Sequence, residues 1–291
     1  MSLQSLILFG LAASALLNLF SVGLSASPQD ATYLFRRPGE LIRALLAMNV
    51  VMPLFAVGLI SVFEFTPAVR IALVALSVSP IPPPIPAKGL KSGGKASYVI
   101  GLQVAIGLLA TVVVPLAMWV VGHLRQGGVL QLSIAPVAKV VVISIVLPIA
   151  AGIVMRRLAP ALAERVARPL TQVSGLGVVL CIVIVWIAAA PAMWSLIGNG
   201  TGLALVSFIL VGLAVGHILG GPAPENRTAL AIATATRHPG VAILLARANF
   251  PDEKLVVAAV LLYLLINAVV AIPYLLWTKR TRGQSREQEQ A

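Results

Sequence analysis

Residues 228–248 constrain the fold most strongly, because this apolar stretch is interrupted at its centre. A helix of about 20 residues crosses a bilayer, so the stretch is long enough to span a membrane. Its middle carries Arg237, His238, Pro239 and Gly240. Proline has no N–H and clashes with the preceding turn, the residue before it favours an extended conformation, and glycine permits unusual backbone angles. The sequence therefore predicts two half-helices that meet near the middle of a membrane.

The charge at this break is a candidate functional group. Irregular backbone at membrane depth occurs only inside protein or along a watery cavity, and an ionisable side chain there marks a site by default. Arg237 could bind a substrate carboxylate, or it could cap the carbonyls at the end of a half-helix. His238 could be a neutral, hydrogen-bonded core histidine, or it could carry a proton, because histidine titrates near physiological pH.

Composition places the whole chain in a membrane. Of its 291 residues 59% are hydrophobic and only 10% are charged, and the mean hydropathy is +1.00. These values are typical of an integral membrane protein. The net charge of +12 comes from basic residues in short loops, so it does not indicate a nucleic-acid partner. The lone Cys181 has no partner for a disulfide within the chain, and no Cys/His spacing suggests a metal or another cofactor.

Nine apolar spans can be drawn with short loops between them. They cover about 3–25, 40–62, 67–87, 96–121, 134–155, 169–191, 198–220, 227–248 and 254–278. Residues 1–25 have no basic leading segment, so we interpret them as a first span and not as a signal peptide. The sequence thus predicts one membrane domain over residues 1–278. The polar tail 279–291 is expected to be disordered and cytoplasmic.

Basic residues alternate sharply between the loops on the two sides. Fifteen lie on one side: Arg36, Arg37, Arg43, Lys88, Lys91, Lys95, Arg156, Arg157, Arg165, Arg168, Arg227, Lys279, Arg280, Arg282 and Arg286. Four lie on the other: Arg70, Arg125, Arg247 and Lys254. Cytoplasmic loops carry the excess of positive charge. We therefore expect a cytoplasmic C-terminus and an outside N-terminus, in what we take to be a bacterial inner membrane.

The third span is also interrupted. Five prolines fall within seven residues: Pro80, Pro82, Pro83, Pro84 and Pro86. No helix continues through such a cluster, so an extended segment is expected inside the membrane. Two interrupted spans in corresponding places indicate a secondary transporter with inverted repeats, whose broken helices form the substrate site. The repeats would cover about 1–122 and 134–278.

Three stretches resemble the bile acid:sodium symporter family. They are VGLSASPQDATYLFRRPGELIRALLAMNVVMPLFAVGL, the proline cluster followed by KGLKSGGKASYVIGL, and ATATRHPGVAILLARANF. The resemblance implies a fold of two inverted five-span repeats, arranged as a panel and a core, with this chain lacking the first span. The third and eighth spans would be the crossing helices of the core. The second, fourth, seventh and ninth would complete the core, and the others would form the panel.

The chain departs from the family's sodium-coupled members at both crossings. Those members carry a Glu at the second crossing, with Gln and Asn nearby. Alignment on Gly240 puts Ala233 at the Glu position and Arg237 with His238 at the Gln-Asn pair. At the first crossing Pro86 falls near the family's Asn. All nine acids of this chain lie in loops, at span ends or in the tail. The resemblance therefore does not carry a carboxylate-based sodium site to this chain.

Other polar residues near the breaks are candidates for the substrate site. Each also has a structural interpretation, such as bonding to its own helix, joining helices or belonging to a positively charged loop. The set comprises Thr234, Thr236, Ser77, Ser79, Gln103, Asn267 and Lys88, in addition to Arg237 and His238.

These patterns predict an all-α, polytopic secondary transporter. It would move a small organic anion across the lipid bilayer by alternating access, without a carboxylate-based sodium site. If transport is coupled to an ion at all, a proton taken by His238 is favoured over sodium. One alternative is a sodium-coupled symporter of bile-acid-like or other organic anions. Another is a membrane receptor or scaffold that does not transport. An enzyme is disfavoured, because the spans show no acid, Cys–His or Ser–His set at a common depth.

Overall fold

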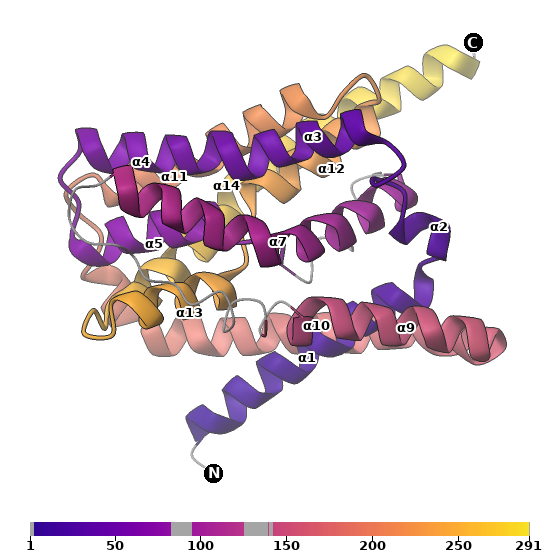
Figure 1. Ribbon diagram of the computed structural model, residues 1–291, viewed down its shortest axis with the longest axis horizontal. Coiled ribbons are helices and arrows are strands. Elements are labelled where there is room, and N and C mark those ends of the chain that lie inside the picture. The colour runs from indigo at the N-terminus through magenta and orange to yellow at the C-terminus, as the bar shows by residue number, and fades with distance from the viewer. Residues whose placement is uncertain (1–2, 83–94, 125–138, 140–141, 291) are drawn as a thin grey trace.

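The computed structural model describes residues 3–82, 95–124, 139 and 142–290, and in these residues every regular element is helical. Figure 1 shows their arrangement. The elements are α1 (Leu3–Ser25), α2 (Pro28–Ala31), α3 (Pro38–Leu45), the π-helix η1 (Leu46–Val51), α4 (Met52–Val62), α5 (Pro67–Val78), α7 (Ala96–Leu124), the π-helix η2 (Val142–Val146), α9 (Leu147–Leu158), α10 (Pro160–Trp194), α11 (Thr201–Leu219), α12 (Pro224–Ala235), α13 (Pro239–Asn249) and α14 (Val256–Gln290).

Five helical segments of the described chain are long and apolar enough to cross a membrane. They are Pro38–Val62, Pro160–Trp194, Thr201–Leu219, Pro224–Asn249 and Val256–Thr281. Shorter apolar helices cover Ala12–Ser25, Pro67–Val78 and Ala96–Ala110. The protein is therefore an all-helical, polytopic membrane protein, and the count of nine spans and the inverted repeat stay predictions. Residues 279–290, expected to be disordered, are drawn here as the end of α14.

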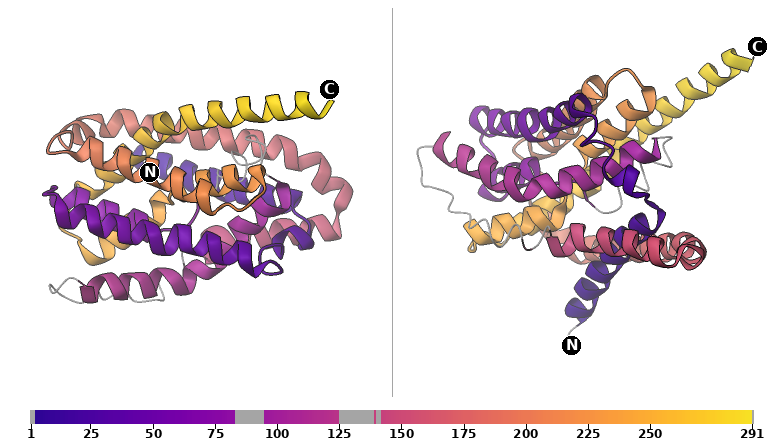
Figure 2. Two further views of the ribbon diagram at one scale, coloured as in Figure 1. Left: turned by 90° about the horizontal axis from the view of Figure 1, so that it is seen from above. Right: turned by 45° about the vertical axis from the view of Figure 1, so that its right-hand side comes forward.

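The helices form two layers. In Figure 1, α1, α9 and α10 lie below the remaining helices, and the right-hand view of Figure 2 shows the same three helices at the bottom. Within the lower layer α1 packs along both α9 and α10. Gly23 and Gly152 bring the backbones of α1 and α9 together, because a Cβ at either position would collide with backbone of the other helix. Such close approach is typical of small residues between membrane helices.

The upper layer contains the interrupted helices and the helices that support them. α5 contacts α13 and α14, and α11 lies along α12. Gly212 and Gly216 place α11 directly against α12, because a Cβ there would lie 2.8 Å from Ala235 Cα and 2.5 Å from Ala231 Cα. The layers meet through α10 and α14, and α2 and η2, which adjoin the lower layer in the chain, both contact α7. At the last contact Trp186 Nε1 donates to Leu261 O at 3.1 Å.

Candidate substrate site at the crossing of two broken helices

The second interruption separates α12 from α13. α12 ends at Ala235, Thr236 is extended (φ −112°, ψ 118°) and His238 is extended (φ −73°, ψ 106°). Pro239 then takes the first position of α13, where a missing N–H removes no helical hydrogen bond. Gly240 lies in the first turn of α13 and has no positive φ. The break thus depends on the rule for residues before proline, and the conformational freedom of glycine is not used.

The first interruption follows α5. The helix ends at Val78, and Ser79 is extended (φ −75°, ψ 149°). The segment 79–82 is non-helical and buried. Pro80 and Pro82 therefore lie in the break, while Pro83, Pro84, Pro86 and Lys88 lie outside the described residues.

The two interruptions are hydrogen-bonded to each other. The backbone N–H of His238 donates to Pro80 O at 2.9 Å. One guanidinium N–H of Arg237 donates to Ser79 O at 3.1 Å. Residues about 158 positions apart in sequence therefore meet at one point, where the irregular backbone of each break supplies the partner of the other.

Arg237 is fully buried at this crossing. Its Nη1 donates to Ser79 O, and its Nη2 donates to Met48 O of η1 at 2.7 Å. Its Nε–H is buried and has no hydrogen-bond partner. Among the described residues Arg237 is the only buried charged side chain, and no carboxylate lies within ion-pair distance of it. The guanidinium thus caps the end of α5 and ties it to η1, and its charge is not balanced by another side chain of the described chain.

The carbonyl of Met48 is available because of the π-helix and a proline. In a π-helix the carbonyl of residue i pairs with the N–H of residue i+5. Five residues after Met48 stands Pro53, which has no N–H. The Met48 carbonyl therefore lacks the partner that the π pattern would provide, and the Arg237 guanidinium takes that place.

Two side chains of α14 hold the end of α12. The hydroxyl of Tyr263 donates to Ala235 O at 2.5 Å and accepts from the backbone N–H of Arg237 at 3.0 Å. The Nδ2 of Asn267 donates to the same Ala235 O at 2.7 Å, and its Oδ1 accepts from Thr236 Oγ1 at 3.3 Å. Tyr263 and Asn267 are four residues apart, so they lie on the same face of the helix.

The other candidates are distributed around the first break and α12. Gln103 on α7 donates to Ile81 O at 3.3 Å, and its buried Oε1 has no partner. Ser77 and Ser79 donate to carbonyls one turn back, Val74 O and Leu76 O. Thr234 is fully buried, and its Oγ1 has no partner.

His238 is half-buried and begins α13. Its Nδ1 accepts from the backbone N–H of Val241 at 3.3 Å, so the ring acts as the N-cap. This assignment requires the neutral ring with its proton on Nε2, and Nε2 is buried without a partner. A proton added at Nδ1 would therefore remove the cap.

Comparison with known proteins decides the family. Residues 14–196, more than half of the chain, match the Sodium Bile acid symporter family. The chain belongs to the sodium bile acid symporter family. It is 22% identical over 262 residues to an uncharacterized sodium-dependent transporter, YocS, of Bacillus subtilis (strain 168). That alignment covers 83% of this chain and 75% of the relative. The resemblance drawn from the sequence is confirmed, and the protein is a membrane transporter rather than an enzyme.

Two groups that complete the crossing of this symporter-family chain were missed from its sequence. Tyr263 reads as an apolar residue of the last span, although its place four residues before Asn267 could have indicated a shared face. The Met48 carbonyl is a backbone group, so its role cannot be read from the residue type. Only the position of Pro53, five residues later, indicates that this carbonyl lacks a π-helical partner. Among the described residues there is no group of three or more His, Cys, Asp and Glu that could hold a metal ion.

Proposed function

We propose that this symporter-family protein moves a small organic anion by alternating access and that Arg237 is the partner of the anion. The supporting observation is a fully buried guanidinium with no carboxylate beside it among the described residues. A single charge inside a membrane protein is costly unless it is paired. A substrate carboxylate would balance the charge and could accept from the unpartnered Nε–H, in a charge-assisted hydrogen bond.

We further propose that this crossing does not use sodium. Carbonyls freed at helix breaks can coordinate a cation, but here Ser79 O and Met48 O accept from Arg237, and Pro80 O accepts from the His238 N–H. An ion beside the guanidinium would also be repelled. Two unit charges about 5 Å apart repel by roughly 3 kcal/mol at an effective dielectric near 20. The guanidinium of Arg237 thus takes the place that a bound sodium ion would have at the two breaks.

The layers suggest how access would alternate. We propose that the layer of α1, α9 and α10 is the panel, that the layer with the broken helices is the core, and that residues 1–122 and 134–278 form inverted repeats. Rocking of one layer against the other would expose the crossing to either side in turn. The charge asymmetry supports a cytoplasmic C-terminus and an outside N-terminus in an inner membrane.

Sodium-coupled symport is the second candidate function. It is favoured by the description of the relative as a sodium-dependent transporter and by the name of the family. A proton taken by His238 is a third possibility for coupling, although it would compete with the N-cap that this ring forms.

Uptake into proteoliposomes separates these possibilities. A thermal-shift screen of the purified protein against organic anions, with and without sodium, first identifies a substrate. Uptake is then measured with sodium replaced by choline, at fixed pH and membrane potential. We expect most of the uptake to persist. Loss of most uptake in choline would show sodium coupling, and binding without any flux would instead indicate a receptor.

A further inference from the structure

A hollow lies between the start of α3 and the start of α12. Its volume is about 520 Å³. We call it the basic hollow and define it by six of the residues that line it: Tyr33, Arg37, Glu40, Arg43, Lys95 and Asn226. It is distinct from the proposed substrate site, because none of the residues that line it takes part in the hydrogen bonds of the crossing, although Arg43 stands only five residues before Met48.

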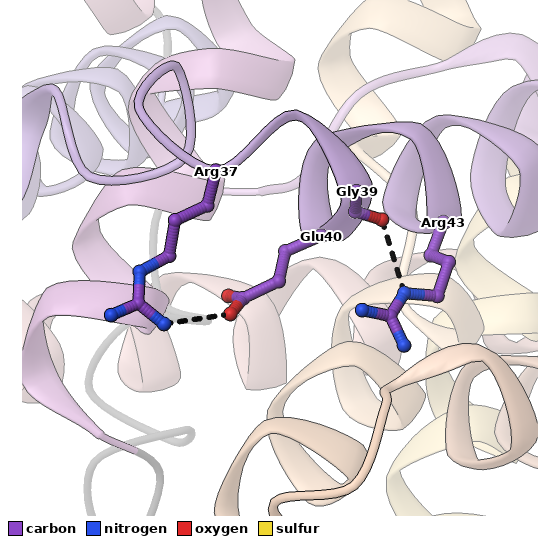
Figure 3. Close-up of polar contacts among 4 residues, drawn as sticks. All are labelled: Arg37, Gly39, Glu40 and Arg43. Atoms are coloured by element: carbon purple, nitrogen blue, oxygen red, sulfur yellow. Dashed lines mark hydrogen bonds and ion pairs between the residues drawn. The ribbon is translucent and has the colours of Figure 1, made fainter.

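Positive charge dominates this hollow. Arg37, Arg43 and Lys95 contribute three cations, whereas Glu40 and Glu225 contribute two acids. Figure 3 shows Arg37, Glu40 and Arg43 pointing to one side of α3. Arg37 donates to Glu40 Oε1 at 3.1 Å, and this hydrogen bond raises the pKa of Arg37. Arg43 Nε donates to Gly39 O at 3.0 Å, which leaves its two terminal nitrogens available on the side of Gly221.

Tyr33 holds two of these cations in place. The guanidinium of Arg37 lies 4.7 Å from the centre of its ring, and the ammonium of Lys95 lies 5.5 Å from it. Cations at such distances are attracted to the face of an aromatic ring. Two of the three positive groups are therefore gathered on one ring.

The hollow also contains acceptors without donors. Asn226 is only 6% exposed, and its Oδ1 is buried without a hydrogen-bond partner. The Oε2 of Glu40 is buried and unpartnered as well. Buried polar atoms in proteins nearly always have partners, so these oxygens point to a ligand with donor groups. The hollow also adjoins the first turn of α12, whose N-cap Ala223 makes no side-chain cap, and helix N-termini attract anions.

We propose that the basic hollow binds a phosphate ester that carries hydroxyl groups, with the phosphate among Arg37, Arg43 and Lys95 and the hydroxyls on Asn226 and Glu40. Lipid is the source that the surroundings favour. Leu46 and Val50 follow Arg43 by three and seven residues and are 42% and 43% exposed, so they offer apolar surface for an acyl chain. A hydroxyl-bearing anionic headgroup such as that of phosphatidylglycerol matches this chemistry.

Binding is tested on the purified full-length protein in dodecyl maltoside. Native mass spectrometry measures the half-saturating concentration of dioleoylphosphatidylglycerol, dioleoylphosphatidylcholine, dioleoylphosphatidic acid and sn-glycerol 3-phosphate. The test variant is Arg43→Gln/Lys95→Gln. The matched control is Arg165→Gln/Arg168→Gln, which removes two exposed cations of α10 outside the hollow. Asn226→Ala examines the hydroxyl contact separately and remains informative if the double variant does not fold.

We expect the test variant to raise the half-saturating concentration of phosphatidylglycerol about 10- to 30-fold, and the control to change it less than about twofold. Asn226→Ala should weaken the binding of phosphatidylglycerol. It should leave the binding of phosphatidic acid unchanged, because that lipid has no glycerol headgroup with hydroxyls. Tight binding of glycerol 3-phosphate with equal sensitivity would support the site and assign a soluble source. Equal losses in both double variants, or binding of phosphatidylcholine as tight as that of phosphatidylglycerol, would overturn the proposal.

Discussion

The two helix breaks differ in what their backbones can offer. The first, at residues 79–82, contains Pro80 and Pro82, so it presents carbonyls but few N–H groups. The second, at residues 236–238, has an N–H at each residue and adds the guanidinium of Arg237. One break is thus mainly a set of acceptors, and the other is mainly a set of donors. They meet with the donors of the second on the carbonyls of the first.

This difference explains how two irregular segments are stable at the same depth. Every buried backbone group without a partner is costly, and a proline-rich segment cannot satisfy its own carbonyls. A second break with free N–H groups removes that cost. The supporting helices differ in how many side chains they give each break. Gln103 donates to one carbonyl of the first break, Ile81 O, whereas Tyr263 and Asn267 both donate to Ala235 O at the edge of the second.

Removal of the Arg237 guanidinium should break this complementarity most severely. Arg237→Met keeps much of the apolar stem but leaves Ser79 O and Met48 O without their donor. Part of this cost is offset because the variant no longer buries a charge. We expect a net decrease of about 2–4 kcal/mol in the free energy of unfolding, together with loss of anion uptake. Arg237→Lys retains the charge but not the fork, so it should bind substrate more weakly. Thermal melting in detergent and proteoliposome uptake measure both effects.

A variant Arg237→Met that melts and transports like the unmodified protein would show that the crossing does not depend on the guanidinium. Normal melting with lost uptake would separate substrate binding from capping. Arg247→Met is a suitable control, because Arg247 is an exposed cation near the end of α13.

The supporting helices give an intermediate test of the asymmetry. Asn267→Leu removes a donor from Ala235 O and an acceptor from Thr236, so it should destabilise the protein by about 1–2 kcal/mol. Gln103→Leu removes one bond to Ile81 O but also removes a buried, unpartnered Oε1, so its effect should stay below about 1 kcal/mol. Melting temperatures in one detergent allow direct comparison. A larger loss of stability for Gln103→Leu than for Asn267→Leu would contradict the expectation that the second break depends more on its supporting side chains.

An effect close in size to that of Gln103→Leu is expected at His238, whose ring begins α13. His238→Ala removes the N-cap and should destabilise the protein by about 1 kcal/mol, whereas His238→Asn supplies another capping side chain and should melt near the unmodified protein. The same pair tests proton coupling. If His238→Asn transports with an unchanged dependence on pH, histidine is a cap and not the coupling group; loss of that dependence would support a proton carrier.

Proline placement made both interruptions predictable from the sequence. Pro80 and Pro82 end α5 and Pro239 starts α13, because the missing N–H and the restriction on the preceding residue act locally. The resemblance to the symporter family likewise rested on these stretches and is confirmed. Gly240 was assigned a backbone role that it does not have, since the residue before Pro239 supplies the extended geometry instead.

The partners of the break could not be predicted in the same way. The bond from Arg237 to Met48 O depends on a π-helix that no side chain announces and on a contact about 189 positions apart in sequence. Tyr263 reached the site because α14 turns one face toward the break, and the relative rotation of packed helices is not written in their local pattern. Long-range contacts of backbone groups therefore could not be predicted from the sequence.

The glycines of α11 restrict how the transporter can change shape. Gly212 and Gly216 leave less than a methyl group of space between α11 and α12, so α12 cannot rotate about its own axis or slide one turn without a backbone collision. Packed elements of this kind move as rigid bodies or by hinges at their ends. Any conformational cycle must therefore carry α11 and α12 together. If bending is concentrated at residues 236–238, the proposed substrate site would also serve as the hinge.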